Sequence, residues 1–384
     1  MKVCFVSHSG DKGGAETVLL RMVDGLGAVG VECSVLLPAD GFLKDQFAMR
    51  QVPHAVFPYR WWAHRDRSLW GRVKDLSTLR LLGRVVSQLR QWDVDLILTN
   101  TSVVPVGALA AFLLRKPHVW YIHEFGRADH GLSYYLGSAI TGKLVAHLSR
   151  VVIVNSKAVG DFYSRYISPE NIRIVYPFVE APPGDGIQPA LGNEFRQPRL
   201  ILLGSYQPGK GQMMAVRAMK RLVDQHVKAE LVLAGFVGDP AYFEALKRAT
   251  SEYHLEKLIS FEAHRTDPGS IIANGDIILM CSRSEAFGLV TVEGMKMGKP
   301  IIGARAGATP ELIQEGYNGL LYEPEDPADL AAKIRYLLEN PAAAKRMGEN
   351  GRRWADAKFS MKAHIDALLQ ALNDGLERAP RVLT

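Results

Sequence analysis

The chain has 384 residues, of which 47% are hydrophobic and 22% charged, the composition of a soluble globular protein. This length favours two domains of ordinary size. The longest nearly unbroken apolar run, residues 103–114, is too short to span a bilayer, and the N-terminus MKVCFVSHSG lacks the pattern of a signal peptide. Three cysteines in apolar, strand-like contexts (Cys4, Cys33 and Cys281) fit buried free thiols better than disulfides or a metal site. We expect a cytoplasmic protein.

The net charge of +6 is concentrated in the first half of the chain. Residues 1–180 hold 21 Lys and Arg against 15 Asp and Glu, whereas residues 181–384 hold 25 of each. The segment YRWWAHRDRSLWGRVK, residues 59–74, also places three tryptophans among its cations. This pattern fits a segment that binds an anionic membrane surface. A solvated charged face with a few packed aromatic side chains is the alternative, and it stays open. Nucleic acid is the least favoured partner, and we expect none. The membrane candidates are Arg60, Trp61, Trp62, Arg65, Arg67, Trp70 and Arg72.

Short apolar runs alternate with amphipathic helical stretches along the chain, which predicts α/β units with parallel sheets. The predicted strands are residues 3–7, 33–37, 96–99, 119–122, 151–154, 199–204, 230–235, 258–261, 276–281 and 300–304. A proline-rich linker, 176–198, separates the two halves. We therefore predict two Rossmann-like doubly wound domains, 1–180 and 181–360, with an interdomain cleft facing the carboxyl ends of both sheets. A C-terminal helix in 361–384 could pack back on the first domain.

Each predicted domain opens with a strand, a glycine-bearing loop and a helix. In the first, Gly13-Gly14 lets the backbone approach a ligand at a helix start, although such a pair on its own is more often only a tight turn. It lacks the GxGxxG pattern and a clear acidic ribose partner, which disfavours an NAD-dependent dehydrogenase. In the second, Lys210-Gly211 precedes a helix, where the lysine is either solvated or directed at a diphosphate.

The stretch SEAFGLVTVEG, residues 284–294, places one carboxylate in the loop after a strand and a second about one turn into a helix. The amides between Glu285 and Glu293, those of residues 287–289, would form an anion site at the helix start. A sugar nucleotide carries hydroxyls on both sides of its diphosphate, so the two glutamates could grip its two ends. The alternative is that both are ordinary surface charges.

Taken in order, these motifs resemble the family 4 retaining glycosyltransferases, which have the two-domain GT-B fold. GGAE (13–16) opens the first domain, IHE (122–124) follows a middle strand, and KG (210–211) follows the first strand of the second domain. Glu285 and Glu293 stand in the E-x7-E spacing of the family, and residues 298–330 continue in the family manner. The resemblance covers nearly the whole chain.

The resemblance implies a role for each matching residue. His123, Lys210 and Glu285 would be catalytic: His123 near the reaction centre, Lys210 on the diphosphate, and Glu285 on the hydroxyls of the transferred sugar. Glu16 would meet the acceptor, and a catalytic base would lie near 262–265. A buried structural histidine is the alternative for His123. The implied donor-binding residues are Gly13, Gly14, Ser205, Lys210, Ala263, His264, Glu285, Ala286, Phe287, Gly288, Leu289 and Glu293.

One position departs from the family pattern. Members commonly carry an arginine after the glycine that ends the first strand of the second domain, and this chain has Ser205 there. One phosphate-binding cation is therefore missing, and Arg283 and Arg305 are candidates to replace it. No metal-ligand spacing is present, so we expect no metal and no cofactor beyond the nucleotide sugar.

We therefore predict a retaining, metal-independent hexosyltransferase of cell-surface polysaccharide or glycolipid synthesis. Its partners would be a nucleotide diphosphate sugar, with UDP and GDP both open, and a glycan or lipid-linked acceptor. It would be cytoplasmic, with peripheral association at the inner face of the membrane. A nucleotide-sugar epimerase of the same architecture and a non-catalytic nucleotide-sugar sensor are the alternatives.

Overall fold

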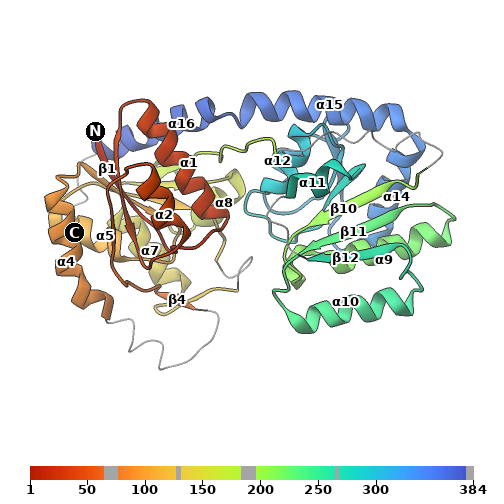
Figure 1. Cartoon of the computed structure of the whole chain (residues 1–384), viewed down its shortest axis with the longest axis horizontal. Coiled ribbons are helices and arrows are strands. Elements are labelled where there is room, and N and C mark those ends of the chain that lie inside the picture. The colour runs from red at the N-terminus through yellow and green to blue at the C-terminus, as the bar shows by residue number, and fades with distance from the viewer. Residues whose placement is uncertain (65–76, 127–130, 183–195, 264–267, 378–384) are drawn as a thin grey trace. The chain divides into compact units, whose positions relative to one another are not determined.

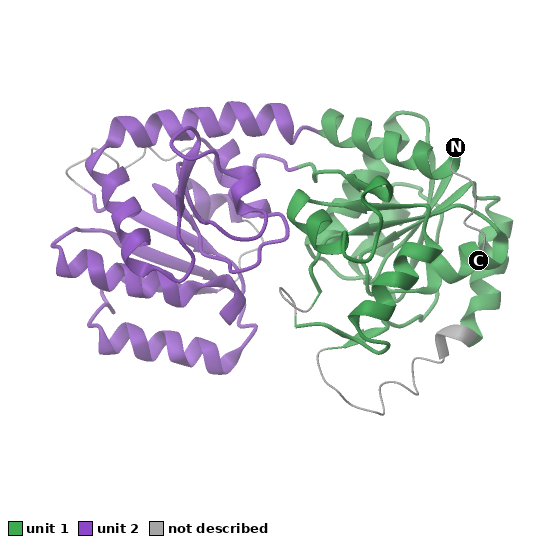
Figure 2. Ribbon diagram, turned by 180° about the vertical axis from the view of Figure 1, so that it is seen from behind, with its two compact units in different colours: residues 1–178, 361–384 green, residues 179–360 purple. Residues whose placement is uncertain are grey.

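The computed structural model describes residues 1–64, 77–126, 131–182, 196–263 and 268–377 of the chain. These form two compact units (Figure 2). Unit 1 comprises residues 1–178 together with 361–384, and unit 2 comprises residues 179–360. Each unit contains one parallel sheet with its own helices, as the alternation of apolar runs and amphipathic stretches predicts.

The sheet of unit 1 has seven parallel strands in the order β3-β2-β1-β5-β6-β8-β9. The order runs outward in opposite directions from β1 and β5, so the loops after these two strands diverge, as at the switch point of a doubly wound sheet. The strands are β1 (Lys2–Val6), β2 (Glu32–Leu37), β3 (His54–Val56), β5 (Leu96–Asn100), β6 (His118–Ile122), β8 (Val151–Val154) and β9 (Ile172–Ile174). A small antiparallel pair, β4 (Ala63–His64) and β7 (Ser133–Tyr134), lies outside this sheet.

Helices cover both faces of this sheet, which explains why its strands are uniformly apolar (Figure 1). Alternate side chains of β1 enter two different cores: Val3 and Phe5 pack with α1 and α16, whereas Cys4 and Val6 pack with α4 and α5. The helices are α1 (Gly14–Ala28), α2 (Phe42–Met49), α4 (Ser77–Gln91), α5 (Val106–Leu114), α7 (Ser138–Leu148), α8 (Lys157–Tyr163) and α16 (Met361–Glu377), with a 3-10 turn at Pro169–Asn171.

The C-terminal helix α16 packs against α1 and the sheet of unit 1. Ile365, Leu368 and Leu372 are buried in the core that α1 shares with that sheet. Gly25 of α1 lies against Ile365, and a β carbon there would overlap the isoleucine side chain. The last helix is therefore an integral part of the core of unit 1.

Unit 2 has six parallel strands in the order β12-β11-β10-β13-β14-β15, with its own reversal between β10 and β13. The strands are β10 (Arg199–Leu203), β11 (Glu230–Gly235), β12 (Ile259–Ala263), β13 (Ile277–Met280), β14 (Ile301–Ala304) and β15 (Gly319–Tyr322). The helices are α9 (Gln212–Asp224), α10 (Pro240–Glu252), α11 (Pro268–Ala273), α12 (Leu289–Lys296), α13 (Thr309–Leu312), α14 (Pro327–Glu339) and α15 (Pro341–Lys358), with a 3-10 turn at Pro208–Lys210.

All ten predicted strands are present, with ends displaced by no more than two residues, and the predicted helix after Gly288 is α12. The sequence prediction missed β3, β9 and β15 and the β4–β7 pair, because two to four residues carry too little periodicity to be recognised. All three cysteines are free, and Cys4 and Cys281 are buried. Within the described ranges, no helix combines the length and apolar character needed to cross a membrane.

The packing of α16 yields a stability prediction. Leu368→Ala should lower the free energy of unfolding by about 2–5 kcal/mol, because it leaves a cavity in a fully buried contact. The measurement is urea unfolding followed by tryptophan fluorescence, with Gln370→Ala on the exposed side of the same helix as the control. Equal transitions for the two variants would contradict the role of α16 in this core.

Candidate functional site

The loop after β10 in unit 2 brings Lys210 toward the neighbouring strand β13. Gly211 immediately precedes α9 and has φ +71°, a left-handed conformation that favours glycine. A β carbon on Gly211 would overlap the carbonyl of Cys281 at the end of β13, so only glycine permits this close approach. The backbone amide of Arg283 also donates to the carbonyl of Gly209 at 3.0 Å. The two segments are therefore joined through their backbones.

Lys210 and Glu285, which these two segments carry, form an ion pair. The Lys210 Nζ lies 2.9 Å from Oε2 of Glu285, and the side chains are 31% and 14% exposed. Glu285 is also held through its own backbone, because its carbonyl accepts the amide of Ala308 at 2.8 Å and Gly307, at φ +56°, packs against it. A cation and a carboxylate, both partly accessible, thus lie together at the carboxyl end of the sheet.

Helix α12 begins beside Glu285. Gly288 precedes it with φ +98°, and a β carbon there would be 3.4 Å from Cγ of Glu285. The first amides of a helix have no acceptor within it, so this end of α12 carries partial positive charge. The Phe287 side chain is buried and packs edge-on against Phe359, with ring centroids 5.5 Å apart, and Ala286 is also buried. These two residues therefore have only their backbone to offer a ligand.

Glu293 lies farther along α12 and is partly buried. Burial raises the pKa of its carboxyl to about 7, because a charged carboxylate loses hydration there. The group is therefore poised between its neutral and ionised forms near neutral pH. A neutral carboxyl can both donate and accept a hydrogen bond, which suits recognition of hydroxyl groups.

Ser205, the position where an arginine was expected, lies in the loop after β10. Its carbonyl accepts from Nε2 of the fully buried Gln212 at 2.9 Å. The two candidate replacements for the missing cation are bound elsewhere: Arg283 pairs with Glu325, and Arg305 pairs with acidic residues at the end of β15 and after α13. Ala263 ends β12 and is exposed. His264 and Arg265, the last two residues of the region 262–265 expected to hold a base, lie outside the described residues.

In unit 1, His123 follows β6 and is held by Asn100 at the end of β5. His123 Nε2 lies 2.7 Å from Oδ1 of Asn100, whose Nδ2 donates to the carbonyl of Ala15 at 3.2 Å. Because this amide oxygen faces the ring, His123 donates from Nε2 and its Nδ1 is left as an acceptor. Burial, reinforced by the charges of His8 and His364, lowers the pKa of His123 to about 3, so the imidazole is neutral at pH 7.

Glu16 lies in the first turn of α1 and is only 4% exposed. Its Oε1 is 3.1 Å from Nδ1 of His8, and burial, with a smaller contribution from the charge of Asp11, raises the pKa of Glu16 to about 7. A β carbon on Gly13 would overlap the Glu16 carboxylate. Gly13 therefore makes room for a side chain of its own helix, whereas Gly14 is the first residue of that helix.

Sequence reasoning gave no role to Glu124, the last residue of the IHE motif. It is buried and accepts hydrogen bonds from the amide of Ser102 at 2.7 Å, from the hydroxyl of the same residue at 2.5 Å, and from the amide of His123 at 3.0 Å. Glu124 thus connects the loops after β5 and β6 and fixes the backbone of His123. Its position beside His123 in the motif was the available signal.

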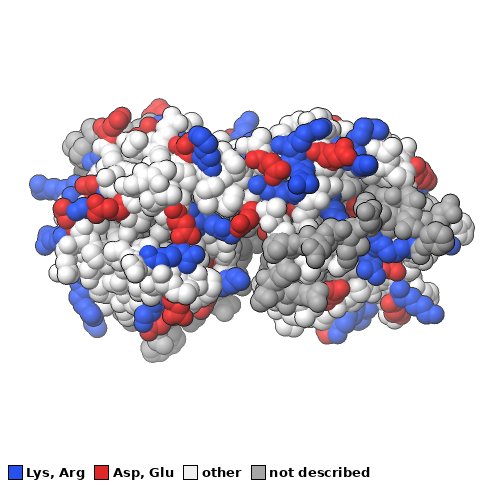
Figure 3. Space-filling view, turned by 45° about the horizontal axis from the view of Figure 1, so that its top comes forward, with Lys and Arg blue, Asp and Glu red and all other residues white. Residues whose placement is uncertain are grey.

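Three of the membrane candidates are described. Trp62 stacks on Trp120 with centroids 5.8 Å apart and donates from Nε1 to the carbonyl of Ser102, so its ring belongs to the interior of unit 1. Trp61 is 38% exposed and Arg60 is exposed. Arg65, Arg67, Trp70 and Arg72 lie outside the described residues. On the face shown in Figure 3, basic and acidic side chains are interspersed.

Glu293 gives a pH prediction. A carboxyl whose pKa rises from 4.5 to about 7 on folding stabilises the native state fully below pH 4.5, and this stability is lost as the pH rises through 7. At pH 8, Glu293→Gln should therefore be more stable than the parent by about 3 kcal/mol, and at pH 4 the two should be alike. Glu16 makes the same contribution to the pH dependence of the free energy of unfolding in both proteins. The difference between variant and parent in urea unfolding across this pH range therefore reports on Glu293 alone. An unchanged difference between pH 4 and 8, as expected for the exposed control Glu349→Gln, would contradict burial of Glu293.

No cluster of three or more His, Cys, Asp or Glu residues able to hold a metal occurs in the parts of the chain that the structure describes. Of the predicted site residues, Lys210, Glu285 and Glu293 lie in unit 2, and Glu16 and His123 lie in unit 1.

Comparison with known proteins shows similarity across both units. A model described as Glycosyltransferase Family 4 matches residues 12–181, and one described as Glycosyl transferases group 1 matches residues 187–354. The chain is 28% identical to a D-inositol 3-phosphate glycosyltransferase of Corynebacterium kroppenstedtii, over 62% of this chain and 56% of that protein, so the match spans about half the relative's length. It is 24% identical to LpsD of Rhizobium meliloti, a lipopolysaccharide core biosynthesis glycosyltransferase, over 98% of this chain and 100% of that one.

Solved structures share the whole fold. The crystal structure of Anabaena Alr3699/HepE in complex with UDP has a TM-score of 0.79 and 25% identity, and covers 97% of this chain and 100% of that one. The two family models together match most of both units. The chain therefore belongs to the family 4 glycosyltransferases and has their GT-B fold, as the order of motifs in its sequence predicts.

Proposed function

We propose that this protein is a retaining, metal-independent hexosyltransferase that uses a nucleotide diphosphate sugar. Family membership supports sugar transfer. HepE has been solved with UDP, with UDP and glucose, and with UDP-glucose, which favours UDP over GDP as the donor nucleotide. The likeness to LpsD over the full chain favours a glycan or lipid-linked acceptor in cell-surface polysaccharide or glycolipid synthesis.

The observation that carries the proposal is the pairing of Lys210 with Glu285 at 2.9 Å beside the start of α12. In the absence of donor, the carboxylate balances the lysine. A diphosphate would compete for Lys210 and release Glu285 to accept hydrogen bonds from the hydroxyls of the transferred sugar. The amides at the start of α12 would stabilise the departing diphosphate together with Lys210.

Glu293 would bind the ribose hydroxyls. Its raised pKa lets it enter the complex as a neutral carboxyl, or ionise when hydroxyls donate to it. In unit 1, the neutral His123 offers Nδ1 as an acceptor to a donor-sugar hydroxyl, since its Nε2 is committed to Asn100. Glu16 would meet the acceptor.

The reaction replaces one bond to the anomeric carbon by another on the same face. The bond from this carbon to the diphosphate oxygen breaks, and its electron pair leaves with the diphosphate, which Lys210 stabilises. The acceptor oxygen forms the new bond, and its proton passes to the departing diphosphate oxygen. Configuration is thereby retained without an enzyme-bound sugar and without a metal, because a cation and helix amides meet the developing charge.

Calorimetric titration with UDP and GDP, each with and without Mg²⁺, tests the donor site. We expect UDP to bind more tightly, with an affinity indifferent to Mg²⁺ and at least about tenfold weaker in Glu293→Ala, since two hydroxyl hydrogen bonds are lost. Glu349→Ala, exposed on α15, is the matched control and should bind as the parent does. Proton NMR of the transfer product should show the anomeric configuration of the donor.

Several outcomes would contradict this proposal. Binding that requires Mg²⁺, or that survives unchanged in Glu293→Ala, would refute the donor site. Inversion at the anomeric carbon would refute same-face transfer. Isomerisation of the sugar nucleotide without any acceptor would identify an epimerase, and tight binding without turnover of any acceptor would identify a sensor.

We also propose peripheral association with an anionic membrane through the basic segment 59–74. Each arginine near such a surface contributes about 1 kcal/mol of attraction, which salt screens. Replacing Arg60, Arg65, Arg67 and Arg72 by Gln should therefore weaken co-sedimentation with phosphatidylserine vesicles at low salt. The control replaces four exposed arginines of unit 2, Arg221, Arg346, Arg352 and Arg353. Unchanged co-sedimentation of the first variant would refute the proposal.

A further inference from the structure

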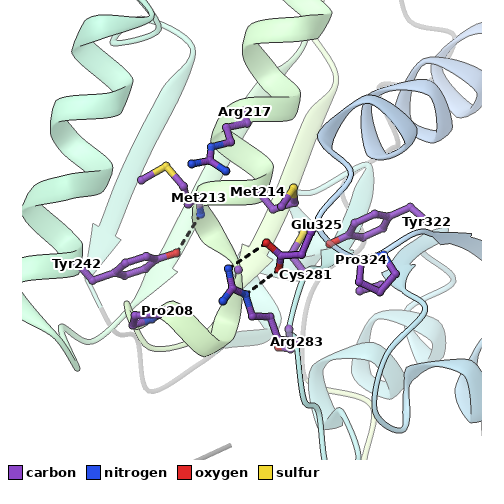
Figure 4. A pocket seen from close by; sticks show the side chains of 13 residues that line it. Pro208, Met213, Met214, Arg217, Tyr242, Cys281, Arg283, Tyr322, Pro324 and Glu325 are labelled. Atoms are coloured by element: carbon purple, nitrogen blue, oxygen red, sulfur yellow. Dashed lines mark hydrogen bonds and ion pairs between the residues drawn. The ribbon is translucent and has the colours of Figure 1, made fainter. Parts of the chain in front are cut away.

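Unit 2 contains a pocket of about 140 Å³ at the start of α9, larger than a single water needs (Figure 4). Neither Lys210 nor Glu285 lines it. Its walls come from α9, α10 and the chain segments that leave β13, β14 and β15. The residues on which the argument rests are Met213, Met214, Arg217, Tyr242, Arg283 and Glu325.

Two arginines from different elements line this pocket. Arg283 leaves β13 and is bound by Glu325 through two contacts, Nε to Oε1 at 2.8 Å and the second guanidinium nitrogen to Oε2 at 3.1 Å. Arg217 projects from α9 and is exposed. With one carboxylate against two guanidinium groups, these three side chains leave the pocket with a net positive charge.

Tyr242 faces both arginines. Its hydroxyl accepts the backbone amide of Met213 at 3.0 Å, which leaves its own proton to donate. Burial raises the pKa of Tyr242, while the charges of Arg283 and Arg217 act in the opposite direction. Both guanidinium groups are therefore close enough to act on a hydroxyl that itself lines the pocket.

Glu325 holds its place at a conformational cost. Its backbone adopts φ +64°, a left-handed conformation that is unfavourable for a residue with a side chain. Its side chain is 54% exposed, and that of Arg283 is 60% exposed, so water competes with the pair. A ligand that binds Arg283 better than this carboxylate could displace Glu325.

We propose that this pocket binds a small phosphate-bearing anion, which displaces Glu325 from Arg283 and is held by Arg283, Arg217 and the Tyr242 hydroxyl. A phosphate offers more acceptor oxygens and more negative charge than a carboxylate, and guanidinium groups bind it through paired hydrogen bonds. Because Lys210 and Glu285 do not line the pocket, this binding requires no particular donor chemistry.

Methionine-methyl NMR tests the proposal locally, because Met213 and Met214 line the pocket. Their signals, assigned with Met→Leu variants, should shift and saturate as inorganic phosphate is added at constant ionic strength. Arg217→Gln should weaken this binding about tenfold or more, the loss expected for one charge-assisted hydrogen bond. Glu325→Gln should strengthen it, because Arg283 is then released. Arg221→Gln, one turn along the same helix and outside the pocket lining, should leave it unchanged.

Lys210→Met separates this site from the donor site. Phosphate should shift Met213 and Met214 in that variant as in the parent, even where UDP binding is lost. Shifts that disappear in Lys210→Met would assign the phosphate to the donor site and overturn the proposal. It would also be overturned by the absence of saturable shifts, by equal affinity in Arg217→Gln, or by affinity that does not rise in Glu325→Gln.

Discussion

The candidate site of unit 2 depends on one close backbone approach, that of the loop before α9 to the chain leaving β13. The amide of Arg283 donates to the carbonyl of Gly209, and Gly211 lies against a carbonyl of the same chain too closely to carry a side chain. Lys210 belongs to one of these segments and Glu285 to the other. The backbone therefore brings the two side chains within reach of each other, and the 2.9 Å ion pair forms at the cost of ordering the long lysine side chain.

Both units hold a carboxyl group at the cost of stability. Glu16 and Glu293 are buried enough that the pKa of each rises to about 7, so at neutral pH each opposes folding relative to its hydrated state. Neither position is required by the sheet: one lies at the start of α1 and the other within α12, beside a carboxyl-end loop. Buried carboxyl groups that destabilise the fold and lie near the loops at the carboxyl end of a sheet are candidates for binding or catalysis, because a functional role would explain why a destabilising residue is kept.

The fold could be predicted because both sheets are covered on two faces, so their central strands appear as uniform apolar runs between amphipathic stretches. The short edge strands β3 and β9 could not, because three residues that pair on one side carry no such pattern. The site was predictable only where chemistry is local in sequence, as in residues 284–294. Gln212, which holds the Ser205 loop, and Glu124, which holds His123, act through contacts that spacing alone does not encode.

Gly13 shows the same limit, because its close approach to the Glu16 carboxylate is a contact that sequence spacing does not encode. Ser205 stands where the family commonly has a phosphate-binding arginine. Arg283 and Arg305, the two candidates to replace the family cation, are both bound to carboxylates. Lys210 and Glu285 cancel, so a diphosphate would meet a pair without net charge and the amides of α12. Amide dipoles act only at short range, whereas an arginine also attracts an anion from a distance. In the donor site that we propose, the serine would thus leave the diphosphate without the long-range attraction of an arginine.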